Sequence, residues 1–173
     1  MKLTAFAPSL LVLASGLAST SAGHGWGDLD CLTDDDAAFL VDILVSISVK
    51  FDPEYVTQFL TDDFVLQSDS INWIFGIPLG KDSFTDKNVL LAGSYNLTQT
   101  EPQPPIVVSY IMHTCADIAY RSTTIETTPV QGIHILKTRR EDGIWKATVS
   151  WDEFNSAADL FALGVTGCVL PKS

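Results

Sequence analysis

The second half of the chain contains four consecutive runs of strand length, and this pattern limits the fold more than any other feature. The runs cover Ile106–His113, Asp117–Glu126, Val130–Thr138 and Ile144–Phe154, and Asp142-Gly143 joins the last two. Runs rich in β-branched and aromatic residues, separated by short segments with turn residues, are typical of neighbouring antiparallel strands. The sequence therefore predicts a four-stranded antiparallel meander, followed by a short helix over Ala157–Leu163.

The first half of the chain predicts a buried helix. Thr33 precedes the aspartates at 34–36, which gives a hydroxyl N-cap and negative charge at the positive end of a helix. Residues Phe39–Phe51 are mostly apolar except for Asp42, Ser46, Ser48 and Lys50, and three of these, Asp42, Ser46 and Lys50, recur every four residues. This spacing indicates a helix with one narrow polar face, while the alternation over Val45–Val49 also fits a strand.

Shorter elements are predicted between this helix and the meander. Pro53 suits the first turn of a second helix over Glu54–Leu60, the alternating run Phe64–Phe75 predicts a strand, and Ser83–Leu91 predicts a third helix. The segment Gln99–Pro105 holds three prolines and is typical of a connector. Helices that precede a curved sheet predict an α+β fold in which the sheet wraps around the first helix.

The N-terminal segment has the pattern of a secretory signal peptide. Lys2 gives the positive start, Leu10–Leu13 begin a short apolar run, and Thr20-Ser21-Ala22 offers small residues at a cleavage site. Ser15 and Gly16 interrupt the apolar run, which is too short for a membrane anchor. We expect a signal peptide over 1–22, a flexible leader over 23–32, a single domain over 33–170, and a protein that is secreted or resides in the secretory-pathway lumen.

The cysteines and the sequon fit that compartment. Cys31, Cys115 and Cys168 allow one disulfide bond, and all three pairings stay open because pairing depends on the fold. Asn96 begins an Asn-Leu-Thr sequon, so a surface glycan is expected there.

Charge and motif content narrow the function classes. The net charge is −11, and such a surface repels nucleic acid and anionic membranes. The sequence contains no His-x-x-x-His, no Cys-x-x-Cys, no calcium-binding loop, no Gly-x-Ser-x-Gly and no phosphate-cradling loop. We therefore expect no metal, no cofactor and no nucleic-acid partner.

Several local sequences resemble a known superfamily. They are Cys31-Leu32-Thr33-Asp34, Ser68–Asn72, Gly76–Gly80, Gly132-Ile133 and Glu153–Ser156. Together with the element order, they resemble fungal secreted proteins of the nuclear transport factor 2-like superfamily, which includes ketosteroid isomerase, scytalone dehydratase and polyketide cyclases. The resemblance implies a cystatin-like α+β fold: a cone-shaped, strongly curved antiparallel sheet around N-terminal helices, with a pocket at the open end. It also implies a homodimer through the outer sheet face.

Asp69 is the first candidate for catalysis. On the predicted strand it shares a face with Val65, Ile71 and Trp73, and a desolvated carboxylate on an apolar face is suited to accept a proton near neutral pH. The resemblance places it near the base of ketosteroid isomerase, with a spacing one residue longer. The alternative is a structural Asp at a strand bend that accepts hydrogen bonds from backbone donors.

Two further residues are candidates for catalysis. His134 shares a strand face with Gly132 and Leu136 and could be a general acid or base, or a structural histidine. Asn155 follows the last strand, where the resemblance places a catalytic acid in polyketide cyclases; an amide there could only orient a carbonyl or enolate oxygen, or satisfy the strand end. His113, beside a turn, is a weaker candidate.

Aromatic residues could line a pocket for a flat apolar ligand or could fill the core. The ligand-binding candidates are Trp73, Tyr110, Tyr120 and Trp151. The first predicted helix holds no Tyr, so the oxyanion hole of ketosteroid isomerase has no counterpart there, and steroid isomerisation by that arrangement is not supported.

Two functional hypotheses follow. The first is a cofactor-free tailoring enzyme, a cyclase, isomerase or dehydratase of a small hydrophobic polyketide- or terpenoid-like molecule in fungal secondary metabolism. Relatives in this group include cyclases that dimerise anhydride-type polyketides. The alternative is a non-catalytic secreted protein that binds a small hydrophobic ligand or a host component.

Overall fold

The meander forms one side of a six-stranded sheet in the order β2-β1-β6-β5-β4-β3. The computed structural model describes residues 31–100, 103–126 and 128–162. The strands are β1 (Leu60–Gln67), β2 (Asp82–Phe84), β3 (Ile106–His113), β4 (Asp117–Thr124), β5 (Gln131–Glu141) and β6 (Ile144–Phe154). The helices are α1 (Asp34–Ile47), α2 (Pro53–Val56), α3 (Asp69–Phe75), α4 (Lys87–Thr100) and α5 (Ser156–Ala162), with a 3₁₀ turn over Thr57–Phe59. The predicted signal peptide, the leader up to residue 30, Cys168 and the end of the predicted domain lie outside the described residues.

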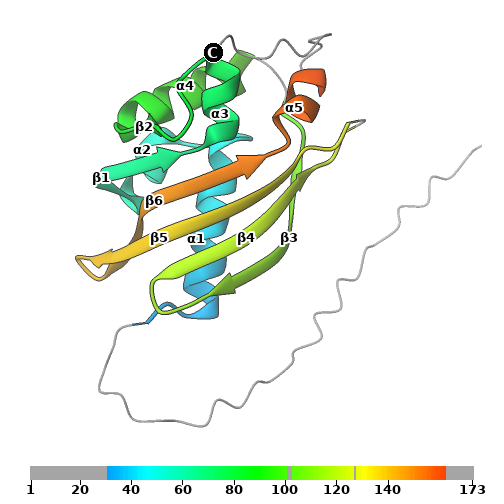
Figure 1. Cartoon of the computed structure of the whole chain (residues 1–173). Helices are drawn as coiled ribbons and strands as arrows, with labels where there is room; N and C mark the ends of the chain where they lie inside the picture. The colour runs from blue at the N-terminus through cyan, green and yellow to red at the C-terminus, as the bar shows by residue number, and fades with distance from the viewer. Residues whose placement is uncertain (1–30, 101–102, 127, 163–173) are drawn as a thin grey trace, which may run out of the picture.

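The predicted α+β arrangement is confirmed. Strands β3 to β6 pair in antiparallel order, and β1 joins the sheet as a parallel neighbour of β6. The β5–β6 hairpin turns at Asp142 and Gly143, which both have positive φ, as a tight two-residue turn requires. The curved sheet lies against α1 on one face, and α2, α3 and α4 gather near the β1–β2 edge (Figure 1). No helix in the described part is both long and apolar enough to cross a bilayer.

Helix α1 begins as its capping residues predict. The Asp36 N–H donates to Thr33 Oγ1 at 3.1 Å, and the Thr33 N–H donates to Asp36 Oδ2 at 3.0 Å, which completes a capping box. These hydrogen bonds to Thr33 hold the pKa of Asp36 below its usual value. The apolar side of the helix is buried against the sheet through Leu40, Val41, Leu44 and Ile47. Each such side chain contributes about 1.5–3 kcal/mol through burial, so α1 forms the centre of the core.

The predicted strand over Phe64–Phe75 is wrong in its second half. Strand β1 ends at Gln67, and Ser68 caps α3 by accepting a hydrogen bond from the Ile71 N–H at 3.0 Å. Gly76 ends the helix with φ +70°, a conformation that favours glycine. The two ends of α3 therefore override the alternation of apolar residues. Because residues 69–75 form a helix, Asp69, Ile71 and Trp73 do not share a strand face as predicted.

Two other predicted boundaries also move. The predicted helix Ser83–Leu91 is replaced by β2 and by α4, which begins at Lys87 after Asp86 accepts a hydrogen bond from the Asn88 N–H at 2.8 Å. Helix α4 continues to Thr100, into the predicted connector. The predicted second helix is divided into α2 and a 3₁₀ turn, and Leu60 already belongs to β1.

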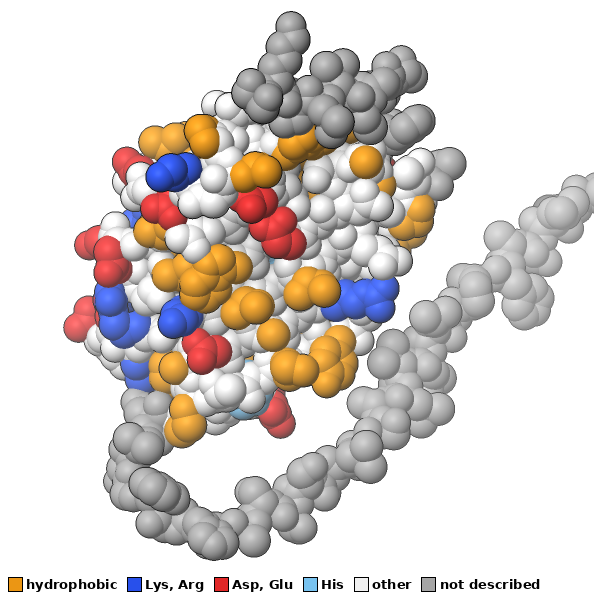
Figure 2. Space-filling model, viewed as in Figure 1, with side chains coloured by type: hydrophobic (Ala, Val, Ile, Leu, Met, Phe, Trp, Pro, Cys, Tyr) orange, Lys and Arg blue, Asp and Glu red, His pale blue; other side chains and the backbone are white. Residues whose placement is uncertain are grey.

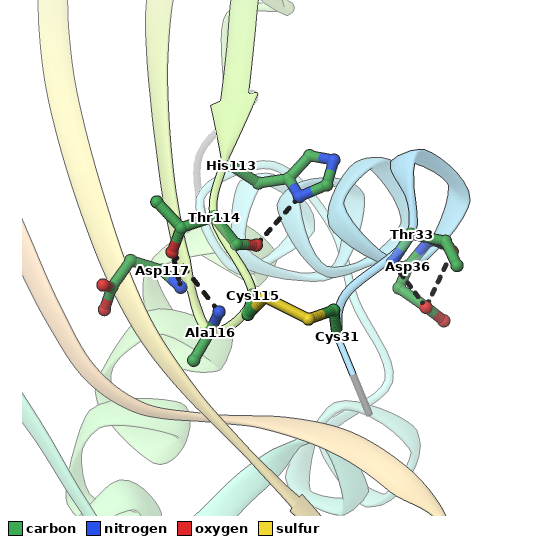
Figure 3. The surroundings of a disulfide bond; sticks show 8 residues. All are labelled: Cys31, Thr33, Asp36, His113, Thr114, Cys115, Ala116 and Asp117. Carbon is green, nitrogen blue, oxygen red and sulfur yellow. Dashed lines mark hydrogen bonds between the residues drawn. A yellow bond between two sulfur atoms is a disulfide. The ribbon is translucent and has the colours of Figure 1, made fainter. Parts of the chain in front are cut away.

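A disulfide joins Cys31 to Cys115 and ties the start of α1 to the β3–β4 turn (Figure 3). This pairing selects one of the three that the sequence left open. The Leu32 N–H also donates to the Cys115 carbonyl at 3.1 Å. Nearby, His113 Nε2 lies 2.8 Å from Asp34 Oδ1, and His113 Nδ1 lies 3.0 Å from the Thr114 carbonyl oxygen. The β3 end and the α1 start are thus linked covalently and by an ion pair.

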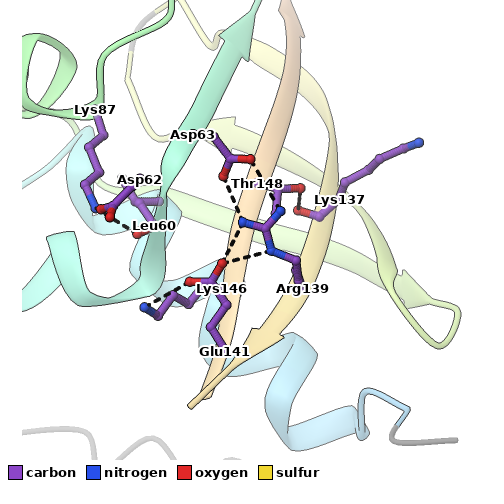
Figure 4. A network of polar contacts seen from close by, with 9 residues as sticks. All are labelled: Leu60, Asp62, Asp63, Lys87, Lys137, Arg139, Glu141, Lys146 and Thr148. Carbon is purple, nitrogen blue, oxygen red and sulfur yellow. Dashed lines mark hydrogen bonds and ion pairs between the residues drawn. The ribbon is translucent and has the colours of Figure 1, made fainter. Parts of the chain in front are cut away.

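A polar network links strands β1, β5 and β6 near the β5–β6 turn (Figure 4). The Arg139 guanidinium on β5 reaches across β6 to the Asp63 carboxylate on β1, with nitrogen–oxygen distances of 2.9 and 3.3 Å. It also contacts Glu141 at 2.6 Å. The guanidinium holds the pKa values of Asp63 and Glu141 below their usual range. These groups are exposed, so the network adds little to stability and mainly orients neighbouring strands.

The His113–Asp34 pair predicts a pH-dependent contribution to stability. The Thr114 carbonyl and the Asp34 carboxylate raise the pKa of His113 above 6.5 in the folded state. A raised pKa means that the folded state binds the proton more tightly, so the pair stabilises the fold fully below about pH 6.5 and less as pH rises through the folded value. We expect Asp34→Asn to lower the free energy of unfolding at pH 5.5 and to have a smaller effect at pH 9. Urea denaturation of the disulfide-bonded proteins measures this, and a difference that does not change with pH would contradict it.

Candidate functional site

A cavity of about 180 Å³ lies between the concave face of the sheet and helices α1, α3 and α4. Its wall is mostly apolar and comprises Leu44, Val45, Ile47, Leu66, Ile71, Leu90, Ile106, Tyr120 and Phe154. Its polar lining residues are Ser48, Ser94, Ser122, His134 and Asp152. Small-molecule sites usually have apolar walls with a few placed polar groups. The cavity is therefore the candidate site.

Three polar residues of the cavity come from three neighbouring strands. Strand pairing sets Tyr120 beside His134 and His134 beside Asp152, and Ser122 beside Gly132. Ser122 Oγ lies 2.8 Å from His134 Nε2, and His134 Nδ1 lies 2.9 Å from Asp152 Oδ1. Because residues two apart share a strand face, the register alone brings serine, histidine and aspartate into one hydrogen-bonded line.

The partners fix the direction of each hydrogen bond. An ionised carboxylate only accepts hydrogen bonds, so we assign the proton between His134 and Asp152 to Nδ1. In the tautomer with its proton on Nδ1, Nε2 is unprotonated and accepts a hydrogen bond from the Ser122 hydroxyl. The lone pair of Nε2 is the basic atom of the site.

Asp152 is itself held in place. The Ser150 hydroxyl, fully buried, donates to Asp152 Oδ1 at 2.7 Å. The side chains of His134 and Asp152 are only 15% and 17% exposed. A buried, doubly hydrogen-bonded carboxylate fixes both the position and the tautomer of the imidazole, which is what a proton-transfer site needs.

Tyr120 adds a neutral donor. Its ring stacks on the His134 ring with centroids 4.4 Å apart. Burial and the negative charge of Asp152 raise the pKa of Tyr120 well above 10. Within the described residues the Tyr120 hydroxyl has no hydrogen-bond partner, and the residue lines the cavity. The phenol therefore stays protonated and is available to donate to a bound oxygen.

Gly132 makes room for the His134 ring. A Cβ atom at Gly132 would lie 2.7 Å from His134 Nε2 and 3.3 Å from Ser122 Oγ. The first distance is shorter than two such atoms tolerate, so any side chain at this position must displace the ring. Gly132 is thus a positioning residue.

Asp69 lies outside the cavity, and its predicted place on a desolvated strand face is wrong. It is exposed in the first turn of α3 rather than desolvated on a strand face. Its Oδ1 accepts a hydrogen bond from the Gly80 N–H at 2.6 Å, which anchors the loop after α3. Glu153 accepts hydrogen bonds from the Asp69 and Ser70 N–H groups at 2.8 and 3.2 Å. Asp69 therefore matches the structural alternative.

The other predicted residues divide between the cavity and the surface. His134 and Tyr120 line the cavity. Asn155 is exposed, and its Oδ1 accepts from the Ala158 N–H at 3.1 Å at the start of α5. Asn96 is exposed on α4, where a glycan has access.

The three remaining aromatic candidates do not line the cavity. Trp73 lies half-buried on α3. Tyr110, on the outer face of the sheet, is 59% exposed. Trp151, also on that face, donates through Nε1 to Gln67 Oε1, and the Lys137 ammonium lies 5.6 Å from its ring centroid. Tyr110 and Trp151 therefore lie on the opposite side of the sheet from the cavity.

Sequence reasoning missed Ser122 and Asp152 as site residues. Ser122 shares a strand face with Tyr120, and Asp152 shares one with the buried Ser150. The period-two alternation of each strand places Ser122 and Asp152 on the inner face of the sheet. Only the register between the strands shows that both residues lie beside His134. Within the described part of the chain, no group of three or more His, Cys, Asp or Glu side chains could hold a metal ion.

The fold and cavity define an α+β cone of the ketosteroid isomerase and polyketide cyclase type. The family model described as NTF2-like domain matches residues 30–166, and the chain belongs to this family. A comparison with curated protein sequences finds no match.

Solved structures share the fold. IdmH of Streptomyces antibioticus, proposed to be a polyketide cyclase, is 18% identical with a TM-score of 0.55, over 75% of this chain and 99% of IdmH. A SnoaL-like protein of unknown function from Burkholderia thailandensis is 13% identical with a TM-score of 0.57, over 72% and 98% of the two chains. A protein with the ketosteroid isomerase-like fold from Catenulispora acidiphila, in complex with trimethylamine, is 13% identical with a TM-score of 0.55, over 73% and 93%. At these identities the likeness shows the fold alone.

The role of Gly132 predicts a specific coupling with His134. We expect Gly132→Ala to lower the free energy of unfolding by about 1–3 kcal/mol, as overpacking of a tight site does. The same substitution in a His134→Ala background should have a clearly smaller effect, because the clashing ring is gone. Urea denaturation of the four proteins measures this coupling.

Gly93 provides the matched control. It lies in α4, and a Cβ atom added there would have nothing within 4 Å. Gly93→Ala should therefore raise the free energy of unfolding by about 0.5–1 kcal/mol through helix propensity. Equal effects of Gly132→Ala with and without His134 would contradict the positioning role.

Proposed function

We propose that the protein is a cofactor-free enzyme that transfers a proton on a small, mostly apolar carbonyl compound, with His134 as the general base. The observation that supports this most directly is the hydrogen bond from His134 Nδ1 to Asp152, which leaves Nε2 as the basic atom in the cavity. A general base at this position is suited to a cyclisation, an isomerisation or a dehydration, because each of these reactions begins with removal of a proton next to a carbonyl group.

The proposed mechanism involves four side chains of the cavity. The Ser122 hydroxyl rotates away from His134 Nε2 to make room for the substrate, and Nε2 then takes the proton from the substrate carbon. The Asp152 carboxylate stabilises the imidazolium that forms, through the hydrogen bond of 2.9 Å. The Tyr120 hydroxyl donates to the carbonyl oxygen as it gains enolate charge, and low solvent access strengthens that interaction.

The size and polarity of the cavity support a small hydrophobic substrate. Sites for drug-sized ligands measure about 300–1,000 Å³, and this cavity of about 180 Å³ is smaller. Its volume favours a change within one polyketide- or terpenoid-like molecule over the joining of two anhydride-type polyketides. The fold shared with IdmH agrees with a cyclase. A place in fungal secondary metabolism remains part of this proposal.

We also propose that the protein is secreted or resides in the secretory-pathway lumen. The Cys31–Cys115 disulfide supports an oxidising compartment such as the secretory-pathway lumen or the exterior. A non-catalytic binder of a hydrophobic ligand would use the same cavity but would have no need of a basic Nε2, so catalysis is the hypothesis that the site favours.

Solvent exchange of a defined ketone tests proton transfer before the natural substrate is known. We expect the protein to catalyse exchange of the C1 protons of 2-tetralone for deuterium in D₂O. The loss of the C1 proton signal in ¹H NMR spectra measures the rate of this exchange. His134→Gln should slow this exchange by about 10²-fold or more, as the loss of a general base does. Tyr120→Phe should slow it by about 10²-fold, as the loss of one oxyanion donor does.

Asp69→Asn is the matched control, because it keeps an acceptor oxygen for the Gly80 N–H. This variant should exchange at the wild-type rate. Exchange that is no faster than in buffer, or that persists in His134→Gln, would remove His134 from catalysis and leave a binding protein.

A homodimer through the outer sheet face is the remaining part of the proposal. Hydrophobic side chains lie among charged ones on the face in view in Figure 2. The exposed ones on this side of the sheet are Val107, Tyr110, Met112, Ile133 and Ile135. Exposed apolar groups gathered on one face indicate an interaction surface.

Light scattering after size exclusion tests the dimer. We expect a dimer for the wild type and a monomer for Ile133→Lys, since a charge in the centre of the face opposes association. Val89→Lys, on exposed α4, should remain a dimer. A wild-type monomer, or dissociation by both substitutions, would contradict this assignment.

A further inference from the structure

The Ser122 hydroxyl forms one hydrogen bond in the described structure, and it is directed at a base. Ser122 Oγ lies 2.8 Å from His134 Nε2, while His134 Nδ1 lies 2.9 Å from Asp152 Oδ1. Nucleophile, base and orienting carboxylate in this order constitute the arrangement that activates a serine. We propose that Ser122 is a nucleophile and that the cavity also accepts small apolar carboxylic esters for acyl transfer to water. This activity goes beyond the proposed proton transfer at carbon.

Comparison with neighbouring serines supports a chemical role. Ser70 and Ser83 donate to backbone carbonyl oxygens, at 2.9 and 3.1 Å. Ser150 donates to the Asp152 carboxylate at 2.7 Å. These hydroxyls satisfy buried acceptors. Ser122 instead donates to the lone pair of an imidazole whose other nitrogen is held by a carboxylate, and it lines the cavity.

The surroundings of Ser122 leave its oxygen accessible. Its partner on β5 is Gly132, which has no side chain to cover the hydroxyl. A Cβ atom at Gly132 would lie only 3.3 Å from Ser122 Oγ. The same glycine therefore admits the His134 ring and keeps the serine oxygen open toward the cavity.

Tyr120 supplies a donor for the oxyanion. It lies two residues before Ser122 on β4, so both side chains are on the concave face, and both line the cavity. Its hydroxyl has no partner among the described residues. A protonated phenol without a partner is suited to bind the negative oxygen of a tetrahedral intermediate.

The chemistry balances with water as the co-substrate. Ser122 Oγ attacks the ester carbonyl carbon while its proton moves to His134 Nε2, and the imidazolium then protonates the leaving alkoxide as the carbon–oxygen bond breaks. A water molecule, deprotonated by Nε2, next attacks the acyl-serine. The bond from the acyl carbon to Ser122 Oγ breaks, the hydroxyl regains its proton, and a carboxylic acid leaves. No oxidant, reductant or metal takes part.

Covalent labelling with diisopropyl fluorophosphate tests this directly. We expect one adduct on the intact protein by mass spectrometry, with loss of fluoride, and peptide mapping should place it on Ser122. Ser122→Ala should give no adduct, and His134→Gln should label at least about 10²-fold more slowly, because the base is lost. Ser109→Ala should label at the wild-type rate, since Ser109 is exposed on β3 outside the cavity.

The outcome is distinguishable from that of the proposed function. If the wild type catalyses 2-tetralone exchange and takes the label on Ser122, both proposals stand. If folded wild-type protein takes no label, or if Ser122→Ala is labelled as fast as the wild type, the nucleophile proposal is overturned while proton exchange by His134 is unaffected. Hydrolysis of p-nitrophenyl butyrate should fall at least about 10²-fold in Ser122→Ala, and an unchanged rate would also overturn it.

Discussion

The hydrogen bond between His134 and Asp152 is the interaction on which the functional account depends. It joins neighbouring strands β5 and β6 across 2.9 Å and leaves Nε2 as the unprotonated nitrogen. Without it the imidazole could rotate or take the other tautomer, and neither Ser122 nor a substrate would meet a base. Ser150 on Asp152 and Tyr120 stacked on the ring hold this arrangement, and Gly132 gives it space.

The fold supplies the environment that makes this arrangement useful. The capped helix α1 lies against the concave sheet, and its residues Leu44 and Ile47 form part of the cavity wall. The disulfide and the His113–Asp34 pair fix the other end of α1 to the β3–β4 turn. A rigid helix and a curved sheet thus enclose a space that apolar side chains do not fill, where a few polar groups face little competing water.

The sequence predicted the meander, the capped first helix and the place of His134, because these depend on local signals: strand runs, a Thr-Asp capping box and period-two alternation. It did not predict α3, because the apolar alternation after Phe64 hid a Ser68 cap and a Gly76 terminus. That error placed Asp69 on a buried face, whereas it is exposed. Ser122 and Asp152 could not be identified because they lie 12 and 18 residues from His134, and only strand register brings them together.

The most direct test of the account is the protonation pattern of the His134 ring at neutral pH. Long-range ¹H–¹⁵N correlation NMR, with His134 assigned by comparison with His134→Gln, distinguishes the two neutral tautomers. We predict a proton on Nδ1, shifted downfield by the hydrogen bond to Asp152, and an unprotonated Nε2. A ring that is protonated on Nε2 instead, or one that exchanges freely between tautomers, would contradict it.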